Sequence, residues 1–292
     1  MWDKAWLLLV LTMFMWGANA PVVKLAAGEI SPMTIVMLRW ALVGVAVMLF
    51  RPPSFRQDWQ QAKKRPWFML GMALLMTVSN ASIFIGAQYT TGINLSILQG
   101  AGPVLVMFGA WAWFGTRIGP VRVGGLIVST IGVLLLATQG NILALGGVKL
   151  NIGDLLMLMS VVFYTIYILS LRYRPEMPNY SFYCFIAVFS LLISAPMLAA
   201  EMAMGQTFMP TWKGLLALLY VAFLTSMLGQ IFFMRGVELV GPGRASQFQN
   251  LAPLIGSVMS AIVLGEQFAL YHILALVLVT GGILIAERYG AR

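Results

Sequence analysis

Long apolar runs are the feature of this sequence that most limits what it can fold into. The stretches at 126–137 and 273–286 contain no charged residue and no alternation of apolar and polar positions. A helix needs about 17 to 25 such residues to cross a hydrocarbon core of about 30 Å, whereas barrel strands would alternate over about ten residues. Only helices and closed barrels satisfy their backbone groups in lipid, so the sequence predicts an all-α membrane protein.

The composition agrees with a chain embedded in lipid. Of the 292 residues, 60% are hydrophobic and 9% are charged, against about 25% charged in a typical soluble domain. The single cysteine, Cys184, excludes an intramolecular disulfide and any zinc site built from cysteines. The single histidine, His272, argues against a metal centre with histidine ligands, so we expect no metal and no cofactor.

Charged or turn-forming residues divide the apolar runs into ten predicted membrane spans with short connections. The first run contains Ala18-Asn19-Ala20, which resembles a signal-peptide cleavage site, but Pro21 argues against cleavage, so we interpret the run as a retained span. The spans are predicted near residues 6–25, 33–50, 67–87, 92–113, 119–138, 153–171, 180–200, 213–233, 243–264 and 268–287.

Positive charge falls on one side of this ten-span arrangement. Fourteen of the 18 Lys and Arg residues lie on the side of the N-terminus, while Lys24, Lys149 and Lys213 lie on the other side and Arg39 lies within a span. This asymmetry follows the positive-inside rule and accounts for the net charge of +9 without a nucleic-acid partner. It predicts that both termini are cytoplasmic.

The two halves of the chain repeat each other. An offset of 148 residues places Thr12, Trp16 and Asn19 on Ser160, Tyr164 and Tyr167. Each half holds five spans, an odd number, so the second half must enter the membrane in the opposite sense. The sequence thus predicts ten transmembrane helices arranged as two inverted five-helix repeats, residues 1–146 and 147–292. An offset of 150 matches the remaining pairs: Asn80/Gln230, Gly86/Gly236, Ser96/Ser246, Gln99/Gln249, Pro103/Pro253, Gly115/Gly265, Thr130/Thr280 and Gly132/Gly282.

Inverted repeats are typical of carriers, because two pseudo-symmetric halves can expose a midplane site to each side in turn. Polar and aromatic residues inside the spans fall on matching faces of the two halves, and such groups usually face a cavity or another helix. The aromatic rings could stack on a substrate or simply pack, and the amides could bind it or join helices. We predict that these residues line a central cavity: Trp16, Asn19, Asn80, Gln99, Tyr164, Tyr167, Gln230, Gln249 and Asn250.

Two prolines and one arginine inside the predicted spans are candidates for gating and for substrate binding. Pro103 and Pro253 remove backbone N–H donors deep in their helices, which favours kinks and a gating role. Arg39 could anchor an anionic substrate, or it could snorkel outward or bind helix-end carbonyls. No carboxylate lies near the predicted midplane, so proton coupling has no support in the sequence but stays open.

Short motifs along the whole chain resemble the EamA-type carriers of the drug/metabolite transporter superfamily. The resemblance implies a bacterial inner-membrane carrier that exports amino acids, related metabolites or toxic compounds, with spans five and ten outside a central cavity. Gly115-Thr116 departs from the Gly-Glu that the family has at this place, whereas Glu266 keeps it and is expected at a helix start. The motifs are Trp16-Gly17 to Lys24, Ser31-Pro32 with Leu38-Arg39, Pro103, Pro253 and Leu264-Gly265-Glu266.

The leading hypothesis is an exporter of a small metabolite or toxic organic solute that works by alternating access, with the solute and membrane lipid as its partners. An anionic metabolite carrier or exchanger that uses Arg39 is the first alternative. A membrane-embedded enzyme is disfavoured because the sequence contains no catalytic motif, and we expect no enzymatic activity. A non-transporting assembly partner is disfavoured because the loops are short. A homodimer stays open.

Overall fold

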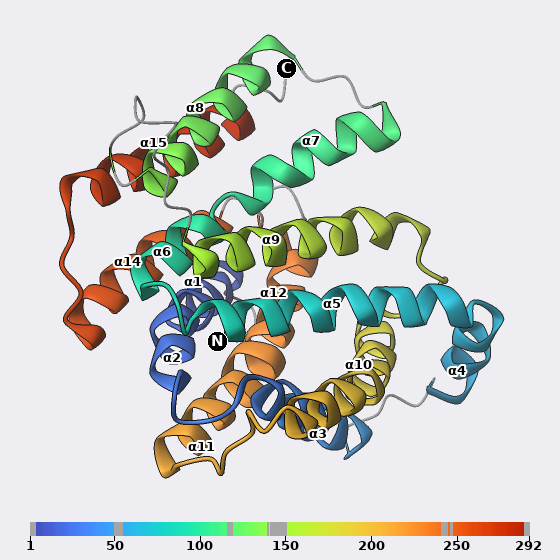
Figure 1. The fold of residues 1–292 in the computed structure, drawn as a ribbon. Helices are drawn as coiled ribbons and strands as arrows, with labels where there is room; N and C mark the ends of the chain where they lie inside the picture. Colours follow the sequence, from blue (N-terminus) through green and yellow to red (C-terminus); the bar gives the residue numbers. More distant parts are fainter. Residues whose placement is uncertain are drawn as a thin grey trace.

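The computed structural model describes residues 4–49, 55–115, 119–138, 140, 151–240, 245 and 248–288, and within them every regular element is a helix (Figure 1). The protein is a multi-span membrane protein. Among the described residues, six helical stretches are long and apolar enough to cross a membrane: Ala5–Ala26, Pro66–Gly86, Gly92–Phe114, Ile152–Tyr173, Tyr180–Ala203 and Trp212–Val240. Four shorter apolar helices accompany them: Pro32–Ala46, Val123–Leu136, Leu251–Leu264 and Leu270–Ile285.

Most helices in the described part of the chain follow one another with short connections. The first half of the chain contains α1 (Ala5–Gly17), α2 (Asn19–Ala26), α3 (Pro32–Leu49), α4 (Phe55–Lys64), α5 (Pro66–Gly86), α6 (Gly92–Gln99), α7 (Gly102–Phe114) and α8 (Pro120–Ala137). The second half contains α9 (Ile152–Ser170), the short 3-10 helix η2 (Leu171–Tyr173), α10 (Asn179–Ala203), α11 (Trp212–Leu219), the π-helix η3 (Tyr220–Leu228), α12 (Gly229–Val240), α14 (Leu251–Leu264) and α15 (Leu270–Arg288).

Prolines divide the first and fourth predicted spans. Pro103 has no N–H for the carbonyl of Gln99, and α6 ends at that residue before α7 begins at Gly102. Pro21 likewise has no N–H for the carbonyl of Gly17, where α1 ends. The sequence predicted a kink at Pro103 but treated the first span as one helix, so the break after Gly17 corrects that expectation.

Two further features differ from the expected spans. The eighth span was expected to end near residue 233, but α12 continues to Val240, with Arg235 and Glu238 joined by a salt bridge of 3.0 Å on its surface. The segment that forms α4 was treated as a connection. The ring of Trp59 packs against that of Phe185 of α10, with ring centroids 5.5 Å apart. This charged segment therefore has an apolar face that holds it against the bundle.

Hydrogen bonds identify the two ends of the bundle. Arg65 donates to the carbonyl of Tyr173 at 3.1 Å, which places the start of α5 beside η2 at what we call the basic end, on the right in Figure 1. At the opposite end, Lys24 donates to the carbonyl of Ala87 at 2.9 Å, so α2 and α5 finish together. The basic end is defined by α4 and η2 and contains Arg56, Lys63, Lys64, Arg65, Arg172 and Arg174.

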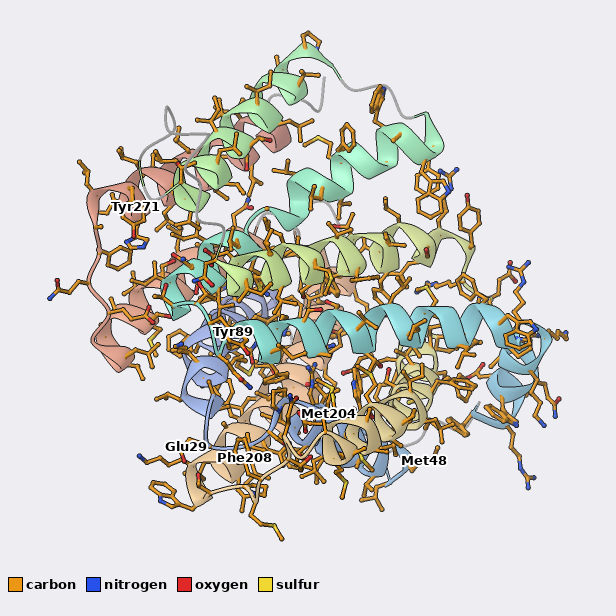
Figure 2. The ribbon with its side chains drawn as sticks, viewed as in Figure 1. Glu29, Met48, Tyr89, Met204, Phe208 and Tyr271 are labelled. Atoms are coloured by element: carbon orange, nitrogen blue, oxygen red, sulfur yellow. The ribbon has the colours of Figure 1, made fainter. Side chains whose placement is uncertain are left out.

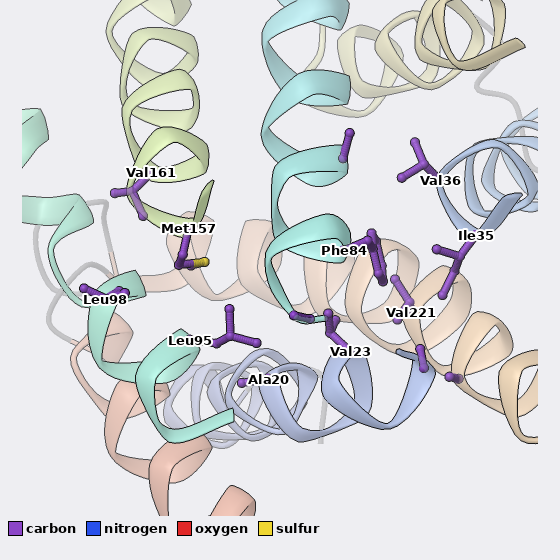
Figure 3. Packing of buried hydrophobic residues seen from close by; sticks show 14 of the residues in the cluster. Ala20, Val23, Ile35, Val36, Phe84, Leu95, Leu98, Met157, Val161 and Val221 are labelled. Carbon is purple, nitrogen blue, oxygen red and sulfur yellow. The ribbon is translucent and has the colours of Figure 1, made fainter. Parts of the chain in front are cut away.

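The middle of the bundle is filled by apolar side chains from helices of both halves (Figure 3). Leu95 and Leu98 of α6 lie near Met157 and Val161 of α9, and the same cluster continues to Phe84 at the end of α5. In lipid the membrane tails are as apolar as these residues, so close packing, rather than removal from water, makes the larger contribution to holding the helices together.

Helices α8 and α15 form a pair at the top of Figure 1 and pack mainly against each other. Glycines allow the close approach. A Cβ added at Gly282 would lie 2.5 Å from the carbonyl oxygen of Gly125, and one added at Gly132 would lie 2.9 Å from that of Ala275. The pair therefore stands beside the rest of the bundle, where the family resemblance expected spans five and ten.

Replacement of Gly282 by alanine should lower the free energy of unfolding by about 1 to 3 kcal/mol, because the new methyl group meets backbone atoms that cannot move aside. The neighbouring Gly281 is the matched control, since nothing lies within 4 Å of its Cβ position. Gly281→Ala should be neutral or slightly stabilising, by up to about 1 kcal/mol. Thermal unfolding of both variants in detergent tests this, and equal melting temperatures would contradict the packing shown for α8 and α15.

Candidate functional site

The guanidinium of Arg39 lies where α3, α5 and the π-helix η3 meet. Its Nε donates to Ser226 Oγ of η3 at 2.7 Å, and its Nη1 donates to Asn80 Oδ1 of α5. The guanidinium carbon also lies 5.0 Å from the centre of the neighbouring Trp40 ring. Three helices that are distant in sequence thus converge on one positive charge inside the bundle.

The two acceptors of Arg39 are themselves held in place. Asn80 donates its amide to the carbonyl of Met76, 2.6 Å away and one turn earlier on α5, so its oxygen is turned toward Arg39. Ser226 donates its hydroxyl to the carbonyl of Val221 at 2.6 Å, which leaves the oxygen lone pairs for the guanidinium. Both side chains are therefore oriented as acceptors before any solute is present.

The π-helix η3 supplies this geometry. A π-helix widens the turn, and π-helical turns are frequent at functional sites. Side chains from other helices satisfy two of its carbonyl groups: Trp16 Nε1 of α1 donates to Thr225 at 3.0 Å, and the Tyr183 hydroxyl of α10 donates to Ser226 at 2.9 Å. There is room for the indole because a Cβ added at Gly229 would lie 2.8 Å from its Nε1.

Two tyrosines of α9 border the same region. The rings of Tyr164 and Tyr167 stack, with centroids 5.8 Å apart and planes inclined by 16°. Tyr164 and Tyr183 are close enough to Arg39 to interact with it electrostatically. Tyr164 is 41% exposed, whereas Tyr167 is 7% exposed. The side chain of Tyr164 is therefore accessible, while that of Tyr167 is packed against it.

The structure brings some of the predicted site residues together and leaves others apart. Arg39 contacts Asn80 directly and has Tyr164 nearby, with Tyr167 stacked behind it. Trp16 joins this group through the π-helix.

The remaining predicted residues lie on other helices or at helix ends. Asn19 begins α2, and its Oδ1 is buried without a hydrogen bond among the described residues. Gln230 is half-buried in α12, Gln99 is exposed at the end of α6, Gln249 is half-buried, and Asn250 is buried just before α14.

Pro103 and Pro253 each lie in the first turn of a helix, Pro103 in α7 and Pro253 in α14. Pro253 is buried in the first turn of α14, and a Cβ added at Gly100 would lie 3.1 Å from its ring. Since Gly100 is in the break between α6 and α7, the two irregular places meet inside the bundle. The side chain of Pro103 lies outside the described part of the structure, and its gating role stays a prediction.

Sequence reasoning missed two members of the Arg39 group, Ser226 and Tyr183. A signal for the first was present, because Thr225 and Ser226 are adjacent polar residues inside an apolar span. Tyr183 follows Asn179, Tyr180 and Ser181 at the start of α10, so it belongs to a local polar run at the end of a span rather than to a polar stripe along the helix.

The end of the bundle opposite the basic end is closed by hydrogen bonds between distant segments. Glu266, in the connection before α15, accepts from the backbone N–H groups of Gly92 and Ile93 at 2.7 and 2.8 Å. Asp154 at the start of α9 accepts from the amide of Asn94 at 3.2 Å. Glu266 does cap a helix start, but that of α6 rather than that of α15, which follows it.

The same end is joined at a second place. Thr211, just before α11, donates its backbone N–H to the carbonyl of Glu29 at 2.8 Å, and Figure 2 labels Glu29 near Phe208 of this loop. The carboxylate of Glu201 accepts from the backbone N–H of Met33 at 3.1 Å and so caps α3. Residues of one half therefore bind the helix starts of the other half at this end.

Comparison with known proteins identifies the family. The model of the EamA-like transporter family matches residues 3–138 and, a second time, residues 151–287. The chain belongs to the EamA-like transporter family. It is therefore a membrane transporter of this type, and the resemblance noted in its motifs is confirmed.

Several relatives of this EamA-like transporter align along nearly the whole chain. YyaM of Bacillus subtilis strain 168, an uncharacterized transporter, is 24% identical over 277 residues, which cover 93% of this chain and 89% of that protein. A probable amino-acid metabolite efflux pump of Salmonella typhimurium strain LT2 is 23% identical over 288 residues, which cover 95% of this chain and 93% of that protein. A solved crystal structure superposes with a TM-score of 0.65 at 16% identity over 98% of this chain and 97% of that chain, and so shares the fold.

Proposed function

We propose that this protein exports a small metabolite, an amino acid or related compound, across the bacterial inner membrane by alternating access. In this proposal its ten spans form two inverted five-helix repeats, and both termini are cytoplasmic at the basic end. The solute occupies the region around Arg39, Asn80, Tyr164 and Trp16, with the breaks before Pro253 and around Gly100 able to flex.

The observation that carries the proposal is a reciprocal set of helix contacts. Where two helices are in contact, their counterparts in the other half are in contact as well. At the offsets of 148 and 150 residues, α1, α3, α7 and α8 correspond to α9, α10, α14 and α15, and α5 corresponds to the run from the end of α11 through η3 into α12. Helix α5 contacts α9 and α12 contacts α1; α7 contacts α9 and α14 contacts α1. Helix α3 contacts its own counterpart α10, and α8 contacts α15. This reciprocity is what a two-fold relation between the halves requires.

Three further findings support the same proposal. The family model matches the chain twice, once in each half. One relative at 23% identity is a probable amino-acid metabolite efflux pump. The positive residues around α4 and η2 fit a cytoplasmic location of that end.

Counterflow in proteoliposomes tests the proposal. Vesicles are loaded with a panel of amino acids and related metabolites, and uptake of each labelled solute is measured with and without a pH gradient; vesicles without protein are the control. We expect saturable exchange of one class of solute. Failure of every solute to exchange above the protein-free control would overturn the proposed function, and exchange that ignores the gradient would identify a facilitator.

A further inference from the structure

We propose that Arg39 binds the carboxylate of the transported solute, so that the natural cargo is a small organic acid or zwitterion. The inference rests on the proposed function and names the substrate class of the same site. Its starting point is a positive charge inside the bundle that is held by neutral groups.

No acidic residue in the described part of the chain pairs with Arg39. Its hydrogen-bond acceptors are the amide of Asn80 and the hydroxyl of Ser226, and its other electrostatic neighbours are the phenols of Tyr164 and Tyr183. A charge at this depth is costly unless an opposite charge compensates it, and intramembrane charges commonly mark substrate or ion pathways. The missing negative charge is the one that an anionic group of the solute would supply.

The hydrogen bonds of Arg39 distinguish a role in binding the solute from the role of a snorkelling or helix-capping arginine. Arg39 lies seven residues after Pro32, the first residue of α3, which is about 10 Å along the helix axis. A snorkelling arginine would extend toward the membrane surface or bind helix-end carbonyls. Arg39 instead donates sideways, to side chains of α5 and η3. Its guanidinium is thus held inside the bundle.

The guanidinium also keeps donors for a ligand. Arginine has five N–H donors, and in the described structure two of them are used, one on Ser226 and one on Asn80. The remaining N–H groups lie on the two terminal nitrogens, the pair that forms two parallel hydrogen bonds with a carboxylate. Protein acceptors therefore orient the group without saturating it.

The tyrosine pair suggests what else the solute contains. The side chain of Tyr164 is accessible, is backed by the stacked Tyr167 and lies near enough to Arg39 to interact with its charge. An aromatic face accepts an apolar group or an ammonium group. A carboxylate joined to a short apolar or ammonium-bearing body, as in an α-amino acid, matches both features.

The decisive variant is Asn80→Asp. It preserves the size of the side chain and its acceptor oxygen, but it places a fixed carboxylate against Arg39. If Arg39 serves only the fold, an internal ion pair should leave transport intact. If Arg39 binds the solute carboxylate, the fixed charge should displace it.

The experiment compares wild type, Asn80→Asp, Arg39→Lys and the control Arg56→Gln, which changes an exposed arginine of α4. The probes are acid and amide pairs, leucine with leucinamide and phenylalanine with phenylalaninamide, tested alongside the solutes that exchange in the panel and their amides. Counterflow and solute-induced thermal stabilisation in detergent are both measured, and melting temperatures without solute report folding.

We expect wild type and Arg56→Gln to prefer the acids by about tenfold or more, the scale of one charge-assisted hydrogen bond. Asn80→Asp should keep its melting temperature and lose that preference, and Arg39→Lys should retain part of it. Exchange of solutes that lack an anionic group as readily as of the matching acids, or an unchanged preference in Asn80→Asp, would overturn the inference while the transporter proposal stands. If wild type exchanges no solute, the proposed function itself fails.

Discussion

Replacement of Glu266 by glutamine is expected to loosen the end of the bundle opposite the basic end. The glutamate carboxylate accepts two backbone N–H groups, those of Gly92 and Ile93, at the positive N-terminus of α6. Glutamine keeps one acceptor oxygen but turns an NH2 group toward the second N–H. The variant loses one charge-assisted hydrogen bond and the charge–dipole attraction, about 1.5 to 3 kcal/mol for the bond.

A reporter cysteine makes this opening measurable. Ala87, in the turn before α6, is fully buried, and Ala87→Cys should react slowly with a water-soluble maleimide. The reporter is placed in a Cys184→Ala background so that no other thiol reacts. Glu266→Gln should raise the labelling rate by about tenfold, the effect of roughly 1.4 kcal/mol on the opening equilibrium.

Glu176→Gln is the matched control for this variant. It removes the charge of an exposed glutamate in the connection between η2 and α10, at the other end of the bundle. Its labelling rate should equal that of the reporter alone. Equal rates in Glu266→Gln and Glu176→Gln would show that the α6 cap does not hold this end closed.

Replacement of Gly256 by valine is expected to prevent correct folding. Gly256 lies where α14 crosses α1 and α6, and a Cβ there would be 2.5 Å from Ser96 Oγ and 2.8 Å from the carbonyl oxygen of Gly17. The clash is mutual, because a Cβ at Gly17 would be 2.8 Å from the carbonyl oxygen of Ala252. Backbone atoms cannot rotate away, so we expect a loss of about 3 kcal/mol or more.

Gly71→Val provides the comparison, since Gly71 is also helical but has nothing within 4 Å of its Cβ position. Detergent extracts analysed by size-exclusion chromatography should contain a monodisperse peak for Gly71→Val and aggregated or absent protein for Gly256→Val. Gly256→Ala should fall between them in melting temperature. A monodisperse Gly256→Val protein with the melting temperature of wild type would contradict the crossing of α1, α6 and α14.

Several of the predicted spans could be located well because lipid imposes a local requirement. The predicted spans near 33–50, 67–87 and 119–138 match α3, α5 and α8 within about two residues, since a break in apolar character is visible in the sequence wherever the chain leaves the hydrocarbon core. The division of the first span after Gly17 was missed although Pro21 was visible, because a proline permits a break and neighbouring helices decide whether it becomes one.

The candidate site was predicted only in part. Arg39 and Asn80 stood out because polar groups are rare in apolar runs, and helical periodicity indicated the faces of Trp16 and Tyr164. Periodicity does not indicate which helix stands opposite a face. Gln99 and Gln249 share the polar pattern, yet in the described part of the chain the side-chain acceptors of Arg39 are Ser226 and Asn80.

The sequence by itself determined the membrane class, the approximate spans, the internal repeat and the buried cation. Only the tertiary structure decided that Arg39 of α3 would bind Ser226, 187 positions later, and that Glu266 would cap α6, 174 positions earlier. The reason is physical. The free-energy cost of exposing a polar backbone group or a charge to lipid depends on the local sequence, so the sequence alone indicates which segments can span the membrane. The partner of each polar group depends instead on helix packing, which the relative orientation of all the spans determines.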